Sequence, residues 1–267
     1  MFADLIAESQ LPVLIERELK AVSRDGSRIT GLLLSDGRVI TGRQFIDATY
    51  EGDLFAMTGV SFTVGREANA QYGETLNGVQ KARAVSHQFV KPVDPYVIPG
   101  DPSSGLLEGI NTEPGEDGEA DHRLQAFNYR LCITDDAENQ IPFAQPAGYD
   151  PAQYELLLRN FEAGGLPLPP RILMGPNRQN DVNKKQPPST ARVGMNYDYA
   201  TAHTGERLEF ERRLKRYTQG LLWTLAQHER VPEQIRAQVR RWGWARDEWT
   251  DNDYWPYWPY VREARRM

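Results

Sequence analysis

The densest group of polar side chains suited to substrate binding lies among prolines in residues 178–185. It contains Arg178, Asp181 and Asn183, followed by two lysines. Polar groups on a proline-stiffened loop are suited to recognising an anionic or hydroxylated small molecule. A solvated loop without a ligand is equally consistent with this composition. Arg178 and Asn183 are therefore candidate substrate contacts.

Arginines elsewhere in the chain are candidates for contacts with a carboxylate or a phosphate. Arg66 precedes Glu67, Arg262 precedes Glu263, and residues 265–266 are an arginine pair. A guanidinium matches two oxygens of such an anion with a planar pair of N–H donors. Ordinary ion pairs within the protein are the favoured explanation of the same residues. We retain Arg66 and Arg262 as candidates for substrate or cofactor contacts.

Residues that bind metals or act as nucleophiles are sparse. The four histidines lack the i, i+4 spacing of a helical zinc pair, and Cys132 is the single cysteine. Apolar neighbours make Cys132 a core thiol rather than a reactive one. The acidic residues of 247–253 lack the glycine and distal glutamate of a helix-loop-helix calcium site, which favours a solvated turn. No metal is expected, and no catalytic residue is identified.

All six tryptophans lie within residues 223–258. Stacking on sugar rings is one interpretation, which would make the chain a carbohydrate-binding or accessory module without catalysis. The other is that these rings cement helices onto a core. A binding platform requires several exposed, roughly coplanar rings, so the exposure of the rings distinguishes the two interpretations.

The most informative segment for a ligand site is 43–54. Phe45, Ile46 and Ala48 form a short apolar run that predicts a buried strand over 43–49. Residues 49–52 break this run, and Asp53 is predicted to cap a short helix over 54–57. Junctions of this kind are where open α/β sheets place ligands.

Composition limits the class of protein. The 267 residues are 40% hydrophobic, with a formal charge of -6 and a pI near 5.4. A sizeable core and one or two domains are expected. The acidic balance argues against a general nucleic-acid binder, and no apolar run is long enough for a membrane span.

Local patterns predict a mixed α/β chain. Residues 18–40 contain two Asp-Gly turns between short apolar runs, which predicts an antiparallel meander. Proline-rich residues 166–199 predict an extended loop. The other expected elements are a helix end at 1–8, a strand within 125–134, and helices at 150–161, at 206–227 and from residue 232 onward.

Several short blocks, in order along the chain, resemble a family of FAD-dependent oxidoreductases. The first is FIDATYEGDL at 45–54, which is similar to an Ile-Asp-Ala-Thr-(Tyr/Gly)-(Glu/Asp)-Gly-Asp element of that family. Each block alone is weak evidence, but their order is fairly specific. The later blocks are GV at 59–60, VGRE at 64–67, YGE at 72–74, FNYRLC at 127–132, GYDP at 148–151, NDVN at 180–183 and YVREARRM at 260–267.

The resemblance implies a glutathione-reductase-like flavin domain with a meander, and an inserted substrate domain. It implies that the backbone around Ala48, Thr49 and Gly52 approaches the adenine-pyrophosphate part of FAD, with Asp53 capping nearby and Leu19 near the adenine. A glycine at position 52 would permit that close approach. We expect a partial FAD/NAD(P)-binding domain over 1–65 and a largely helical, loop-rich substrate or cap domain over 66–267.

The chain departs from the family in its glycines, because no two of the 22 are separated by one residue. A Gly-x-Gly-x-x-Gly loop is therefore absent, and the family's glycine-rich loop and C-terminal flavin segment are expected outside these residues. We expect an internal fragment of an FAD-dependent oxidoreductase for a small or carbohydrate-like substrate. It would need its flanking segments, bind FAD weakly or not at all, and be inactive alone.

Overall fold

The chain divides into two compact units in the computed structural model, which describes residues 2–165, 173–174, 179–181 and 189–267. Unit 1 comprises residues 1–63 with 265–267, and unit 2 comprises residues 64–264. Thr63 and Arg266 exchange backbone hydrogen bonds of 2.8 and 2.9 Å. The chain thus leaves and re-enters unit 1 at paired residues, so unit 2 is an insertion in its sequence. The flavin and substrate roles assigned to the two parts stay predictions.

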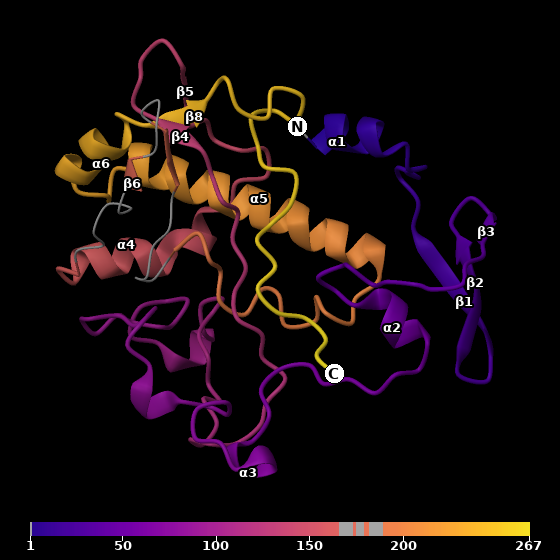
Figure 1. Cartoon of the computed structure of the whole chain (residues 1–267). Coiled ribbons are helices and arrows are strands. Elements are labelled where there is room, and N and C mark those ends of the chain that lie inside the picture. Colours follow the sequence, from indigo (N-terminus) through magenta and orange to yellow (C-terminus); the bar gives the residue numbers. More distant parts are fainter. Residues whose placement is uncertain (1, 166–172, 175–178, 182–188) are drawn as a thin grey trace. The chain divides into compact units, whose positions relative to one another are not determined.

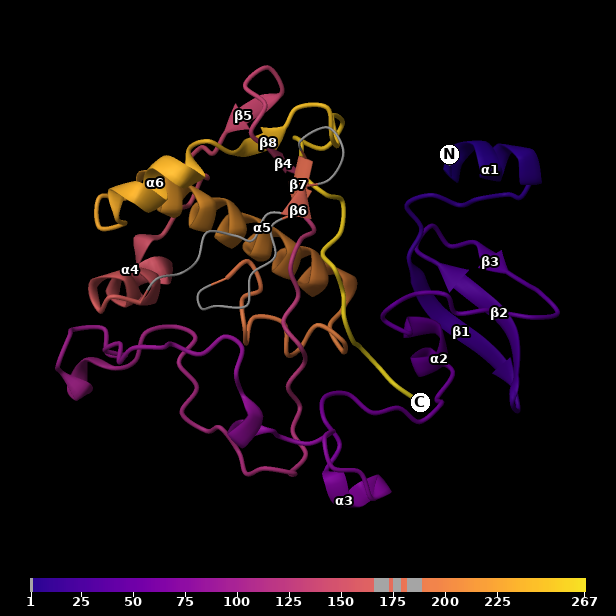
Figure 2. The same cartoon turned by 60° about the vertical axis from the view of Figure 1, so that its left-hand side comes forward.

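Unit 1 contains the predicted meander. Strands β1 (Leu19–Asp25), β2 (Arg28–Leu34) and β3 (Val39–Ile40) pair antiparallel in that order, with helix α2 (Asp53–Met57) packed against β1 (Figure 2). Helix α1 (Phe2–Ser9) precedes them. Gly26 and Gly37 adopt φ of +56° and +84° in the two Asp-Gly turns, the backbone that such turns require. The meander, the helix at 54–57 and helical structure at 1–8 are therefore confirmed.

The buried strand predicted over 43–49 is wrong. These residues form no strand, and Ile46 has 86% of its surface exposed. A central strand needs a hydrogen-bonded neighbour on each edge, whereas the sheet of unit 1 ends at β3 without pairing to this segment. An apolar run indicates a preference for burial, but neighbouring strands must supply the burial itself.

Unit 2 is built around the long helix α5 (Thr204–Gln227), which packs against α6 (Glu233–Val239) (Figure 1). A small antiparallel sheet has the order β5-β8-β4-β7-β6. Its strands are β4 (Ile133–Thr134), β5 (Gln140–Pro142), β6 (Leu173–Met174), β7 (Gln179–Asp181) and β8 (Gly243–Ala245). The other elements are α3 (Asn69–Tyr72), α4 (Glu155–Glu162), and the 3₁₀ turns Lys81–Arg83, Pro102–Ser104 and Pro151–Tyr154.

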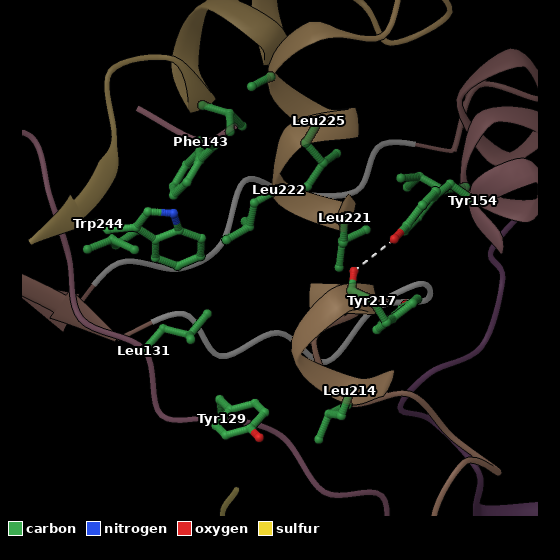
Figure 3. Close-up of a cluster of buried hydrophobic side chains, with 14 of the residues drawn as sticks. Tyr129, Leu131, Phe143, Tyr154, Leu214, Tyr217, Leu221, Leu222, Leu225 and Trp244 are labelled. Carbon is green, nitrogen blue, oxygen red and sulfur yellow. Dashed lines mark hydrogen bonds between the residues drawn. The ribbon is translucent and has the colours of Figure 1, made fainter. Parts of the chain in front are cut away.

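The periodic helices of the C-terminal half are confirmed. In α5, Phe210, Leu214, Tyr217, Leu221 and Leu225 are all buried, as their three- and four-residue spacing predicts. Figure 3 shows this face of α5 beside side chains from other segments of unit 2. The strand predicted within 125–134 forms over 133–134 only. Helices and small antiparallel sheets together place the chain in the mixed α/β class.

Candidate functional site

The turn that leads into α2 is organised by the Asp47 carboxylate. Its Oδ1 accepts hydrogen bonds from the Thr49 amide and hydroxyl at 3.1 and 2.7 Å, and its Oδ2 accepts one from the Phe55 amide at 3.2 Å. The Thr49 hydroxyl oxygen accepts in turn from the Gly52 amide at 3.0 Å. Burial raises the pKa of Asp47, but these hydrogen bonds outweigh it and the net pKa is lowered. Asp47 is thus the carboxylate that caps α2.

The prediction that Asp53 caps this helix is wrong. Asp53 is the first residue of α2 and so lies inside the helix. The N-cap residue before it is Gly52, which has no side chain to supply a cap. A capping oxygen must come from outside the helix, where it can face the free amides of the first turn. Asp47, carried back by the turn, is in that position, and its Oδ2 accepts from Phe55. The role of Asp47 was missed because it lies far from the helix in sequence.

Asp53 instead forms an ion pair with Arg265. The Arg265 Nη1 donates to Asp53 Oδ1 at 2.5 Å and to the Glu51 carbonyl at 3.1 Å. Only 9% of the Arg265 side chain is exposed, and its guanidinium lies 5.2 Å from the centroid of the Phe62 ring. This arginine ties residues 265–267 to the turn. Of the two explanations offered for this arginine, a contact with an anion or an ion pair within the protein, the structure contains the ion pair.

The backbone conformation at position 52 itself explains why this residue is a glycine. Its φ is +70°, where a side chain is strained, and an added Cβ would collide with the ring of Phe55. The group that comes close to Gly52 in the structure is therefore Phe55. Ala48 and Thr49 are exposed, and Leu19 is half-buried at the start of β1. Their contact with a flavin stays a prediction.

The turn does not fit the pyrophosphate of FAD. A pyrophosphate needs free backbone amides at the start of a helix. Here Asp47 occupies the amides of Thr49 and Phe55, and the Thr49 hydroxyl occupies that of Gly52. Glu51 adds negative charge to the same turn, whereas the charge of Asp53 is balanced by Arg265. The exposed edge of the turn fits an uncharged ring of the cofactor better than its phosphates.

Among the substrate candidates, Arg66 is held by Asp121. Both carboxylate oxygens of Asp121 accept from Arg66, one at 2.8 Å from Nε and the other from Nη2. The hydrogen bond that Arg66 donates to Asp121 is the main reason why the pKa of Arg66 is raised. The Arg66 guanidinium is thereby committed to an ion pair of unit 2. Arg178 and Asn183 lie outside the described residues, and Arg262 lies beside Asn128.

The tryptophans do not form an exposed platform. Of the six, Trp258 is exposed at 69%, whereas the others are half-buried or buried. Trp244 and Trp255 pack edge to face, 5.2 Å apart at an interplanar angle of 72°. These rings belong to the core of unit 2, as one of the two interpretations expected. No observation favours the carbohydrate-binding alternative.

The acidic segment 247–253 forms hydrogen bonds with other parts of the chain. Asp247 accepts hydrogen bonds from Asn139 at 2.7 Å and from Gln179 at 3.1 Å. Within the described ranges, no group of three His, Cys, Asp or Glu side chains is placed to hold a metal ion. In the same part of the chain, no helix is both long and apolar enough to cross a membrane.

The fold and the turn thus define a mixed α/β protein with an unpaired, apolar-edged segment before a capped helix. Comparison with known protein families matches the family described as FAD dependent oxidoreductase over residues 1–267. The chain belongs to this family, so the predicted resemblance to FAD-dependent oxidoreductases is confirmed. Searches among curated proteins and among solved structures gave no match.

Proposed function

We propose that this chain is part of an FAD-dependent oxidoreductase that acts on a small molecule. Membership of the family over the whole length of the chain is the observation that carries this proposal. When bound, FAD supplies the redox chemistry, and protein groups position the substrate beside it. Unit 2, with its arginines and its large core, is the part that we assign to the substrate.

For the flavin we propose the exposed edge of the Asp47 turn. Ile46 and Tyr50 are 86% and 73% exposed, and Ala48 between them is also exposed. These three side chains are exposed, uncharged groups of the turn, and together they form the edge that we assign to the flavin. Asp47 and Thr49 hold that edge in place by their hydrogen bonds. A flat ring of FAD would lie against it.

We infer that these 267 residues bind FAD only weakly and do not turn over alone. The sequence contains no Gly-x-Gly-x-x-Gly loop, and the amides of the Asp47 turn are occupied. The negative charge of the pyrophosphate would therefore lack the helix terminus that normally offsets it.

Equilibrium dialysis of the chain against FAD tests this proposal. Ala48→Asp places a charge on the exposed edge, and we expect it to weaken FAD binding about tenfold or more. Val39→Asp is the matched control, because Val39 is 58% exposed on β3 and outside the turn. No binding at millimolar FAD, or equal losses in both variants, would overturn the placement. Bleaching of the visible flavin band by a substrate in the complete enzyme would report the oxidoreductase function separately.

A further inference from the structure

Unit 2 contains buried hydrogen-bond donors that have no acceptor among the described residues. Asn128 is 0% exposed, and its Oδ1 accepts from Arg262 Nη2 at 2.9 Å. The Asn128 Nδ2 and the Arg262 Nε are both buried without a partner. An amide and a guanidinium that touch each other therefore each keep one unused donor.

His87, Ser189 and Thr190 form a second group, which the electrostatic interaction of His87 with Arg262 connects to this pair. The His87 Nδ1 lies 3.4 Å from the Ser189 hydroxyl, and the next residue, Thr190, is 2% exposed with a hydroxyl that has no partner. Burial lowers the pKa of His87, and the positive charge of Arg262 lowers it further. That electrostatic effect links His87 to the Arg262 side of the cluster. Arg262 and His87 are themselves only half-buried, so part of each side chain is exposed to solvent.

The other groups around the cluster are already engaged. The Ser189 hydroxyl bonds to the backbone of Ala191, and the Tyr217 hydroxyl donates to the Ser189 carbonyl. Glu263 accepts from the amide of Gln125 at 2.7 Å. Two further arginines lie nearby over aromatic rings, Arg130 at 5.9 Å from the Tyr260 centroid and Arg192 at 4.9 Å from the Tyr217 centroid.

The unused groups are donors or hydroxyls, and the half-buried Arg262 contributes a positive charge. A buried donor left without an acceptor is destabilising, so an acceptor is favoured here. A carboxylate has two acceptor oxygens in one plane and a single negative charge. It therefore matches the Asn128 amide donor and the Arg262 Nε donor, and its charge complements that of the Arg262 guanidinium.

We propose that Arg262 and Asn128, with Thr190 and His87 beside them, bind the carboxylate of a small organic acid. That this acid is the substrate rests on the proposed function, whereas its binding does not. Arg262 was a candidate from the sequence, and the structure adds the other three residues. Of the four, Asn128 and Thr190 are held in the core and Arg262 stacks on Tyr260, 4.8 Å from its centroid.

The test is an NMR titration of the full chain with glycolate in the absence of FAD. The chain has four histidines, so His87→Gln assigns the His87 imidazole signals by difference. Glycolate should shift the His87 signals with saturation and raise the pKa of His87, because a bound anion favours the imidazolium. Its neutral counterpart, glycolamide, should not. Inorganic phosphate is titrated in parallel.

Arg262→Gln should weaken glycolate binding about tenfold or more. Arg262→Lys keeps the charge but lacks the Nε donor, so it should weaken binding by less. Arg130→Gln is the matched control, because it removes the same charge from the other arginine over Tyr260. Tryptophan fluorescence checks that each variant is folded. Equal effects of glycolate and glycolamide, tighter binding of phosphate, or equal losses in Arg130→Gln and Arg262→Gln would overturn the proposal. Glycolate binding in a chain that fails to bind FAD would instead count against the proposed flavin edge and leave the carboxylate site unaffected.

Discussion

Asp47 carries much of the local structure around the candidate flavin edge. Its two oxygens join three donors from residues on both sides of the turn, including the first turn of α2. A short carboxylate can do this because it reaches its own neighbours and the helix amides at once. Thr49 completes the arrangement by accepting from the Gly52 amide. The Asp-Ala-Thr spacing is therefore explained by hydrogen bonding within the chain.

Replacing Asp47 by Asn should loosen this turn. An amide keeps one acceptor oxygen but loses the other, so either the Thr49 or the Phe55 amide is released, at a cost of about 1 kcal/mol. The measurement is hydrogen exchange of the Gly52 and Phe55 amides, which should become faster. Asp25→Asn is the control, because Asp25 is exposed at the end of β1 and Asn also suits its Asp-Gly turn.

Acid should have the same effect on the unmodified turn. The folded pKa of Asp47 lies below its ordinary value, so its stabilisation is present above about pH 4 and is lost as the pH falls through the folded value. Amide shifts of Phe55 should therefore titrate in the native chain and stay flat in Asp47→Asn. A titration of equal size in both proteins would show that another carboxyl group controls the turn.

Helix α5 contains a glycine in its interior that leaves room for two packed tyrosines. Gly220 lies in its interior, where a Cβ would collide with the Tyr154 hydroxyl and lie 3.1 Å from the Tyr149 ring. The Tyr154 hydroxyl donates to the Tyr217 carbonyl of the same helix at 3.0 Å (Figure 3). The absence of a side chain at this position lets the two tyrosines dock on the helix backbone.

Two glycine substitutions in α5 should therefore have opposite effects. Gly220→Ala should destabilise unit 2 by about 1–3 kcal/mol, because the tyrosines must move. Gly205→Ala, with no atom within 4 Å of its Cβ, should stabilise it by up to about 1 kcal/mol. Urea unfolding followed by tryptophan fluorescence measures both. Destabilisation by Gly205→Ala would contradict the helical-propensity argument, and a neutral Gly220→Ala would contradict the packing one.

The elements that were predictable from sequence are those whose signals are local. The meander has its two Asp-Gly turns, and α5 has an apolar face repeated along its length. The buried strand predicted over 43–49 was wrong because the burial of a strand depends on neighbouring strands, which the residues of the segment itself do not encode. The Arg265–Asp53 pair and the cluster of His87 with Arg262 were not predicted from the sequence, for a related reason. Their members are far apart in sequence, and only the fold brings them together.

At the scale of the whole molecule, the two units differ in how much they bury. In residues 3–63 the fully buried positions are Gly31, Gly52 and Thr58, so no large apolar side chain of this described segment is fully buried. Unit 2 has a continuous core of aromatic and aliphatic side chains. Burial of apolar surface is the main favourable term in folding, so the two units should differ widely in stability.

Unfolding of the full chain should therefore occur in two steps. All six tryptophans lie in unit 2, so their fluorescence follows that unit alone, whereas far-ultraviolet circular dichroism follows both. We expect part of the circular dichroism to be lost at lower urea than the fluorescence change, together with fast exchange of the β1 and β2 amides. Phe55→Ala should shift only the first step, because Phe55 lies in unit 1. Leu214→Ala should shift only the second step and lower the unfolding free energy of unit 2 by about 2–5 kcal/mol, because Leu214 is buried there. Coincident transitions by both probes, shifted together by either variant, would show that the units fold cooperatively and that burial within each does not set its stability.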